Sequence, residues 1–163
     1  MKVQKKIMDH HHEFMLRAIQ CSKESVETGG GPFGAVIVKN GIIISEGINR
    51  VTVSKDPTAH AEVEAIRLAA KKLNNFDLSG CEIYTSCEPC PMCLSAIYWA
   101  RIDKIWFANT KGDAKHIGFD DSFIYDEVVL PLEKRTIPIS QMMRDQAFEI
   151  FQQWIEKKDK VEY

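Results

Sequence analysis

The sequence predicts an α/β fold in which helices cover both faces of a mixed five-stranded sheet, giving three layers in the order α/β/α. The first observation is a hairpin: two runs rich in β-branched residues, 33–39 and 42–48, flank Asn40-Gly41. Asn-Gly between such runs favours a type I′ turn, because that turn needs positive φ at both central positions. The second observation is that helical and strand-like segments alternate along the rest of the chain, which is typical of a sheet covered on both faces.

The individual elements follow from local patterns. Residues 8–28 carry apolar side chains at roughly helical spacing among charged ones, so we expect a first helix there. Thr58 is the expected N-cap of a helix over 59–73, and Pro91 suits the start of a helix over 92–100. The remaining expected elements are strands at 81–85 and 104–108, a candidate fifth strand at 136–139 and a last helix over about 140–156.

Length and composition describe one globular domain spanning residues 1–163. About 45% of the residues are apolar and 27% are charged, the profile of a folded soluble domain rather than a disordered chain. Lys plus Arg total 21 and Asp plus Glu total 23, so the net charge of −2 disfavours duplex binding and membrane-surface binding. The sequence lacks an apolar run of membrane-spanning length and the pattern of a secretory leader. We therefore expect a cytoplasmic protein that binds neither nucleic acid nor membrane.

The cysteines indicate metal chemistry rather than disulfides. There are five, and three of them lie within the seven residues 87–93. Cys90 and Cys93, together with His60, supply two thiols and one imidazole, the ligand types of a zinc ion that keeps an open fourth position. Cys90 and Cys93 are three apart at an expected helix start, so both can point the same way, and a helix N-terminus favours thiolate.

The same residues predict a hydrolytic centre. Zinc held by two thiolates and a neutral imidazole is formally neutral, so it still polarises water and lowers its pKa from about 15.7 to near 7. Glu62, two residues after His60, is the expected general base that takes this proton and then the acid that passes it to a leaving nitrogen. His-x-Glu followed by Pro-Cys-x-x-Cys is the signature of the zinc deaminases.

Two other interpretations use the same cysteines. Cys87 is the nearest candidate for the fourth ligand of a closed structural zinc site. The spacing of Cys87, Cys90 and Cys93 also matches an iron–sulfur run, but the next cysteine of that run is missing. Neither interpretation gives Glu62 a task. The cysteines other than Cys90 and Cys93 are expected in the core or a strand, and the three histidines at 10–12 are expected to be exposed.

Longer stretches of the chain extend this pattern. They are GGPFGAVIVKNG, DPTAHAEVEAIR, CEIYTSCEPCPMC, SAIYWAR and GFDDSFIYDE, followed by the terminal Glu162-Tyr163. In these stretches, over about residues 29–138, the sequence resembles the bacterial guanine deaminases of the cytidine deaminase-like superfamily. HAE and PCPMC are shared by the whole superfamily, so FDDSFIY and the terminal tyrosine carry the information about substrate. The resemblance implies a cytidine deaminase-like fold and zinc-dependent hydrolysis of guanine to xanthine and ammonia.

The resemblance also implies roles for the metal site and the assembly. His60, Cys90 and Cys93 would hold one zinc ion per subunit, and Glu62 would shuttle protons. The protein would form a homodimer in which the C-terminal segment, about 140–163, is exchanged with the partner subunit.

For the substrate, the resemblance implies that Asn49 hydrogen-bonds the purine and that Asp121 contacts the polar edge of the base and helps to move protons. Tyr163 would close the pocket, that of the neighbouring subunit if the C-terminal segments are exchanged. Phe33 and Trp99 would form apolar walls for the purine ring. Asp121 supplies an acceptor and Asn49 a donor, the two types that a purine with a ring N–H and a carbonyl oxygen needs.

Three alternatives stay open from the sequence. A nucleoside deaminase of the guanosine type would use the same zinc residues, with room for ribose. A deaminase of tRNA or single-stranded nucleic acid needs a basic surface, for which the one local candidate, residues 156–160, is interrupted by acids. A non-enzymatic zinc-binding module is the third.

Overall fold

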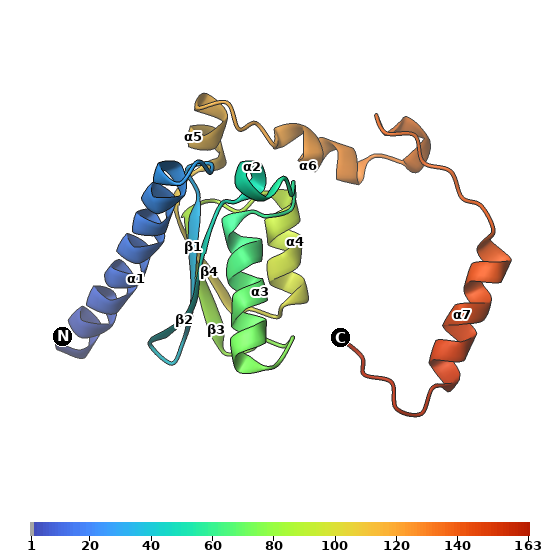
Figure 1. Ribbon diagram of the computed structural model, residues 1–163, viewed down its shortest axis with the longest axis horizontal. Coiled ribbons are helices and arrows are strands. Elements are labelled where there is room, and N and C mark those ends of the chain that lie inside the picture. Colours follow the sequence, from blue (N-terminus) through green and yellow to red (C-terminus); the bar gives the residue numbers. More distant parts are fainter. Residues whose placement is uncertain (1) are drawn as a thin grey trace. The chain divides into compact units, whose positions relative to one another are not determined.

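The computed structural model describes residues 2–163, with side chains from residue 10 onward, as two units, one ending at Asp121 and the other spanning Ser122–Tyr163. Figure 1 shows the elements in chain order. They are α1 (Lys2–Glu27), β1 (Gly34–Lys39), β2 (Ile42–Ile48), α2 (Val51–Ser54), α3 (Ala61–Leu73), β3 (Cys81–Cys87), α4 (Pro91–Trp99), β4 (Lys104–Asn109), α5 (Lys111–His116), α6 (Ser122–Val129), a 3-10 turn (Leu132–Lys134) and α7 (Arg144–Glu156). Among the described residues, no helix is long and apolar enough to cross a membrane.

The first unit contains a mixed sheet with the strand order β2-β1-β3-β4. β1 is antiparallel to both β2 and β3, whereas β3 and β4 are parallel and are joined through α4. The predicted hairpin is confirmed, because Asn40 and Gly41 connect β1 to β2 with φ of 52° and 75°. The α/β class and the mixed sheet are therefore as predicted.

The prediction of a fifth strand is wrong for the described residues, in which the sheet has four strands. The candidate segment, residues 136–139, lies in the second unit and forms no strand. Pro138 has no N–H to donate to a neighbouring strand, and the Thr136 N–H is already used by the Glu127 carboxylate at 3.0 Å. Ile137 is 76% exposed, so the segment buries little apolar surface that would hold a strand in place.

Side chains of β1 alternate between two cores, one on each face of the sheet. Ala35 and Ile37 face α3 and α4 and join the core that contains Ala61, Ala65, Ile83 and Ile97, whereas Val36 and Val38 face α1. The α1 side is filled by Phe14, Ala18, Cys21 and Tyr84. Helices therefore cover both faces of the sheet, α1 on one and α3 with α4 on the other, as Figure 1 shows.

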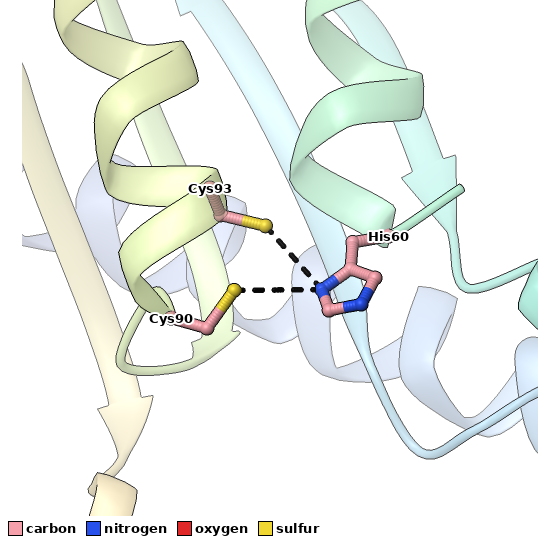
Figure 2. A group of neighbouring side chains, drawn as sticks. All are labelled: His60, Cys90 and Cys93. Atoms are coloured by element: carbon pink, nitrogen blue, oxygen red, sulfur yellow. Dashed lines mark hydrogen bonds between the residues drawn. The ribbon is translucent and has the colours of Figure 1, made fainter. Parts of the chain in front are cut away.

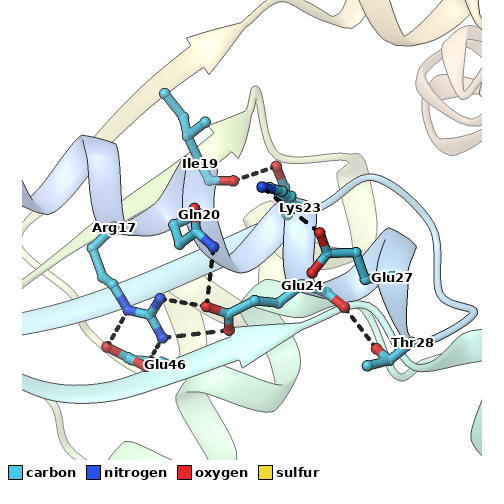
Figure 3. A network of polar contacts seen from close by, with 9 residues as sticks. Arg17, Ile19, Gln20, Lys23, Glu24, Glu27, Thr28 and Glu46 are labelled. Carbon is cyan, nitrogen blue, oxygen red and sulfur yellow. Dashed lines mark hydrogen bonds and ion pairs between the residues drawn. The ribbon is translucent and has the colours of Figure 1, made fainter.

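An ion-pair network fixes α1 to the sheet (Figure 3). The Arg17 guanidinium lies between two carboxylates, donating to Glu46 of β2 at 2.6 and 2.7 Å and to Glu24 of α1 at 2.7 Å. The hydrogen bonds from Arg17 lower the pKa of both carboxyl groups. The bidentate geometry with Glu46 fixes the orientation of the helix as well as its distance from the strand.

Close packing of α3 on β2 depends on a glycine. A Cβ added at Gly47 would lie 2.0 Å from the carbonyl oxygen of Ala61 and 2.7 Å from the backbone nitrogen of Ala65. Only a residue without a side chain therefore lets the first turns of α3 lie against the strand. This contact sets the position of the residues at the start of α3.

Candidate active site

The two helices on one face of the sheet begin next to each other, and their starts carry three metal-ligand side chains (Figure 2). His60 is the N-cap of α3, Cys90 is the N-cap of α4, and Cys93 lies in the first turn of α4. Pro91 follows at the first helical position, as predicted. Thr58 was expected to cap the helix over 59–73, and that prediction is wrong, because its backbone N–H and hydroxyl both donate to Asp56.

The three side chains have the spacing of a zinc site. His60 Nδ1 lies 3.6 Å from Cys90 Sγ and 3.5 Å from Cys93 Sγ, and all three ligand atoms lie within 4.8 Å of one another. Zinc bonds of about 2.3 Å to sulfur and about 2.0–2.1 Å to nitrogen, at tetrahedral angles, would place sulfur and nitrogen about 3.6 Å apart. Three ligands of the soft and borderline types that zinc prefers leave the fourth position open.

The two thiols titrate differently in the metal-free protein. Hydrogen bonds from Cys93 and from His60 lower the pKa of Cys90 to about 4, so Cys90 is a thiolate at neutral pH. Cys93 donates the hydrogen bond to that thiolate, which raises its own pKa, and burial raises it further. The hydrogen bond to Cys90 also raises the pKa of His60. Binding of zinc therefore has to displace the proton of Cys93.

Glu62 lies in the first turn of α3, beside the ligand cluster. Its side chain is 7% exposed, and burial raises the pKa of its carboxyl group, opposed in part by a hydrogen bond with Cys93. A buried carboxyl group with a raised pKa can hold and release a proton near neutral pH, which is what a general acid–base residue requires.

Asn49 follows β2 on the same side of the unit, and its amide is held in one orientation. Its Oδ1 accepts hydrogen bonds from the backbone N–H of Gly31 and of Val51, at 3.3 and 3.2 Å. Because both partners are donors, Oδ1 faces the backbone and Nδ2 is left as the free donor. A hydrogen bond from Arg50 N to Ala59 O, at 2.9 Å, links this loop to the residue before His60.

Phe33 and Asp121 complete this side of the first unit. Phe33 packs edge-on against Phe119, with ring centroids 5.0 Å apart and an interplanar angle of 88°. Burial raises the pKa of the Asp121 carboxyl group, and the negative charge of Cys90 raises it further. Sequence reasoning did not assign Phe119 a role, although it stands directly before the paired aspartates that were singled out.

Comparison with known proteins matches this geometry to a family. Residues 8–109 match the model of the cytidine and deoxycytidylate deaminase zinc-binding region, which spans the whole ligand set. The chain belongs to the cytidine and deoxycytidylate deaminase family. It is 54% identical to the guanine deaminase of Bacillus subtilis, over 94% of this chain and 99% of that protein. It is also 41% identical to a tRNA-specific adenosine deaminase of Aquifex aeolicus, over 80% of this chain and 92% of that protein.

Solved structures agree. The crystal structure of the Bacillus subtilis guanine deaminase matches this deaminase with a TM-score of 0.91, at 55% identity, over 94% of this chain and 98% of that one. A guanine deaminase from Nitrosomonas europaea matches with a TM-score of 0.65, at 31% identity, over 86% and 81% of the two chains. The deaminase is therefore a zinc-dependent aminohydrolase, and His60, Cys90 and Cys93 fit its zinc.

Trp99 and Tyr163, both expected at the substrate pocket, are largely exposed. Trp99 is the last residue of α4 and is 66% exposed. Along the helix axis it lies about 9 Å from Cys93, at 1.5 Å per residue. The role of Trp99 as a pocket wall stays a prediction. Tyr163 belongs to the second unit and is 71% exposed.

Cys87 and His11 both lie outside the group of zinc ligands. Cys87 Sγ lies 3.5 Å from the carbonyl oxygen of Thr110, and burial raises the pKa of Cys87 to about 11. It is not part of the ligand group, so the closed four-ligand site is not formed. His11 was expected to be exposed, but it is half-buried between Tyr84 and Trp106, because it lies on the face of α1 that packs on the sheet.

Proposed function

We propose that this deaminase hydrolyses guanine to xanthine and ammonia. The observation that carries the proposal is its similarity to the Bacillus subtilis guanine deaminase along nearly the whole of both chains. That similarity includes the segments with Asn49 and Asp121, which lie outside the shared zinc signature and on which recognition of the base depends.

Zinc held by the ligand cluster would activate water, and Glu62 would transfer the protons. Zinc, when bound, makes water a nucleophile near neutral pH. The reaction places an oxygen from water on C2 of the purine and releases the C2 amino group as ammonia. We assign the proton transfers to the Glu62 carboxylate, which accepts a proton from water and donates one to the departing nitrogen. Its burial keeps bulk water from exchanging that proton between the two steps.

Recognition of guanine uses the two polar groups beside the metal site. Nδ2 of Asn49 donates to the carbonyl oxygen of the base, since Oδ1 is occupied by backbone N–H groups. Asp121 accepts from a ring N–H, and its raised pKa also suits it to carry a proton. Phe33, backed by Phe119, supplies the apolar wall. A site of this kind rejects a base with the wrong hydrogen-bond pattern, because buried partners would be left unpaired.

Charge disfavours a nucleic-acid substrate. The net charge is −2, and two of the three lysines near the C-terminus pair with acids, Lys157 with Asp159 at 3.4 Å and Lys160 with Glu162 at 3.7 Å. A tRNA substrate depends on a continuous basic surface for its phosphates.

Ammonia release by zinc-loaded protein tests the proposal. Guanine, guanosine, adenine, cytidine and a tRNA anticodon stem are offered in parallel, and product is identified by its ultraviolet spectrum. We expect turnover of guanine alone. Turnover of guanosine but not guanine, or of adenosine within the tRNA stem, would overturn the substrate and leave the zinc chemistry in place. Binding of zinc without turnover of any compound would revive the non-enzymatic zinc module.

We also propose that the protein is a cytoplasmic homodimer in which about residues 140–163 are exchanged. Support comes from apolar side chains that each unit leaves exposed. Tyr98 and Trp99 of α4 are 75% and 66% exposed, and Phe151 and Ile155 of α7 are 66% and 63% exposed. Apolar patches of this kind mark interaction surfaces. All five cysteines are free, which suits a reducing compartment.

A complementation experiment tests the exchange. Chains with Glu62→Ala and chains lacking Tyr163 are each expected to be inactive, and they are unfolded together and refolded as a mixture. If Tyr163 serves the neighbouring site, every mixed dimer regains one complete site, and activity returns. Activity that stays absent, with mixed dimers demonstrated by mass spectrometry, would refute the exchange while leaving the guanine assignment untouched.

A further inference from the structure

We propose that Glu88 is a positioning residue that holds the segment with Phe119 and Asp121 at a fixed place relative to the zinc thiols. The inference rests on the proposed function, because that segment matters through its contacts with the purine. Glu88 lies directly after β3 and two residues before Cys90, so it belongs to the same short loop as the first thiol.

Glu88 binds the segment after β4 through both its backbone and its side chain. Its backbone N–H donates to the carbonyl oxygen of Asn109 at 2.8 Å. Its Oε2 accepts from the backbone N–H of Lys111, the first residue of α5, at 3.1 Å. These two hydrogen bonds hold the segment from Asn109 to Lys111 at both ends, so they fix its distance from Glu88 and its orientation. Removal of the carboxylate would leave Asn109 and Thr110 bonded to Glu88 N–H and Cys87 Sγ, but it would release the first N–H of α5.

α5 transmits this position because it is tied at its start. Thr110 and Asp113 form a capping box, in which Thr110 N donates to Asp113 Oδ2 at 2.8 Å and Asp113 N donates to Thr110 Oγ1 at 3.2 Å. The box closes the first turn on itself, so the helix moves as one piece. The box bonds α5 only to itself, whereas Glu88 bonds Lys111, the first residue of α5, to the loop before Cys90.

The other end of α5 is tied to the substrate-side residues. The backbone N–H of Phe119 donates to the carbonyl oxygen of Ala114 at 2.9 Å, and Lys115 Nζ lies 2.9 Å from Asp120 Oδ2. Asp121 follows directly. A shift of Lys111 is therefore carried along one helix to Phe119 and Asp121, and hence to the packing of Phe119 on Phe33. Through Glu88 the chain couples the metal side of the site to the base-binding side without a direct contact between them.

Two variants of the full-length, zinc-loaded protein test this role. Glu88→Ala removes the acceptor, and Glu88→Gln keeps an oxygen that can accept from Lys111 N–H. Glu27→Ala, an exposed residue of α1 that pairs with Lys23, is the matched control for loss of a surface carboxylate. The measurements are zinc per chain, kcat and KM for guanine, and hydrogen exchange of the amides at 117–119, which donate to Ala114 and Lys115 carbonyls.

We expect Glu88→Ala to keep its zinc, to raise KM for guanine by about tenfold with a smaller change in kcat, and to exchange the 117–119 amides faster. Glu88→Gln should restore most of both properties, and Glu27→Ala should match the unmodified protein. Unchanged exchange and KM in Glu88→Ala, or loss of zinc as its main effect, would overturn the proposal. Hydrogen exchange needs no substrate, so it decides the role of Glu88 even if guanine proves not to be turned over.

Discussion

Two polar clusters on opposite faces of the sheet each contain a histidine and an acidic side chain, yet their hydrogen bonds are arranged differently. On the α3 side, the ligand atoms of His60, Cys90 and Cys93 lie within 4.8 Å of one another, and Glu62 lies beside them. On the α1 side, Trp106 Nε1 and the Tyr84 hydroxyl both donate to Glu82 Oε2, at 2.6 and 3.0 Å, and His11 Nδ1 bonds the Tyr84 oxygen.

The difference lies in the order of donors and acceptors. In the His11 cluster, which comprises His11, Tyr84, Glu82 and Trp106, each donor meets an acceptor, and the network satisfies itself. In the zinc cluster, three metal-ligand atoms face one another, and Cys93 and His60 both donate to Cys90, which leaves Cys90 as a thiolate. Acceptor atoms that face one another are stabilised by a cation between them. A network in which each donor meets an acceptor is already satisfied. A histidine near an acid therefore does not indicate function by itself. The arrangement of hydrogen-bond donors and acceptors around the histidine does.

The largest expected effect comes from deleting one converging acceptor. Cys93→Ala should abolish activity and weaken zinc binding by more than about 100-fold, beyond the loss caused by removing an outer partner. Cys87→Ala is the matched control, because Cys87 precedes Cys90 by the same three residues but does not face the ligand group. Zinc content by atomic emission and guanine turnover measure both. Equal zinc loss in the two variants would contradict the assignment.

Glu62→Gln should separate proton transfer from metal binding. The amide cannot accept the proton from water, so kcat should fall by about 10³–10⁴, near the upper range of general acid–base catalysis. Zinc content and melting temperature should stay close to those of the unmodified protein, since the amide fills the same space. A variant that loses zinc together with activity would make Glu62 part of the metal-holding structure rather than the acid–base group.

The two ends of the Asn49 amide differ in the same way as the two clusters. Oδ1 accepts from backbone N–H groups, whereas Nδ2 is free to donate to the substrate. Asn49→Asp keeps the acceptor for Gly31 and Val51 but replaces the free donor by an oxygen. We expect kcat/KM for guanine to fall by about 10²–10³ while the free energy of unfolding changes little. Steady-state kinetics and urea denaturation of the same preparation check this. A large loss of stability with normal kinetics would reduce Asn49 to a turn residue.

Acidity should weaken the zinc cluster in a defined direction. In the metal-free protein the pKa of Cys93 is raised, so Cys93 carries a proton at neutral pH that zinc must displace. Zinc affinity should therefore rise about tenfold per pH unit for each proton released, and the dependence should steepen as pH falls through the raised pKa of His60 and then towards the Cys90 pKa of about 4. Calorimetry in two buffers of different ionisation enthalpy counts the protons. An affinity that does not vary with pH would contradict this.

The smallest effect on catalysis is expected from the self-satisfied cluster. Tyr84 is 1% exposed, and Tyr84→Phe removes its bonds to His11 and Glu82. We expect a loss of about 1–3 kcal/mol in the free energy of unfolding, because buried partners are left unpaired, with kcat/KM unchanged. The unmodified protein is the reference for both measurements. Urea denaturation gives the comparison, and a loss of activity without loss of stability in Tyr84→Phe would refute it.

The features predicted well from sequence are those fixed by local chemistry. Asn40-Gly41 needs only its own backbone preferences to make the hairpin, and Pro91 needs only its missing N–H to start α4. Cys90 and Cys93 are brought together by a single helical turn. His60 lies far from both in sequence. It could still be predicted, because imidazole is one of the few ligand types that complete a zinc site with two thiols.

The features that sequence reasoning missed depend on partners distant in the chain. Thr58 suits a cap in isolation, but Asp56 captures its hydroxyl and the helix begins later. His11 is half-buried because α1 turns that face to β3. Glu88 acquires its role from Lys111, which lies beyond α4 and β4 in the chain. No local pattern contains these relations.

The close approach at Gly47 restricts how this enzyme can diversify. Any side chain there would collide with the Ala61 carbonyl and push away the helix that begins with His60 and Glu62. A mutation at this position therefore damages hydrolysis of every substrate at once, whatever base the pocket accepts. Changes in the loop at 117–121 leave the zinc ligands where they are. Directed evolution towards a new aminated ring should accumulate substitutions in that loop and leave position 47 unaltered.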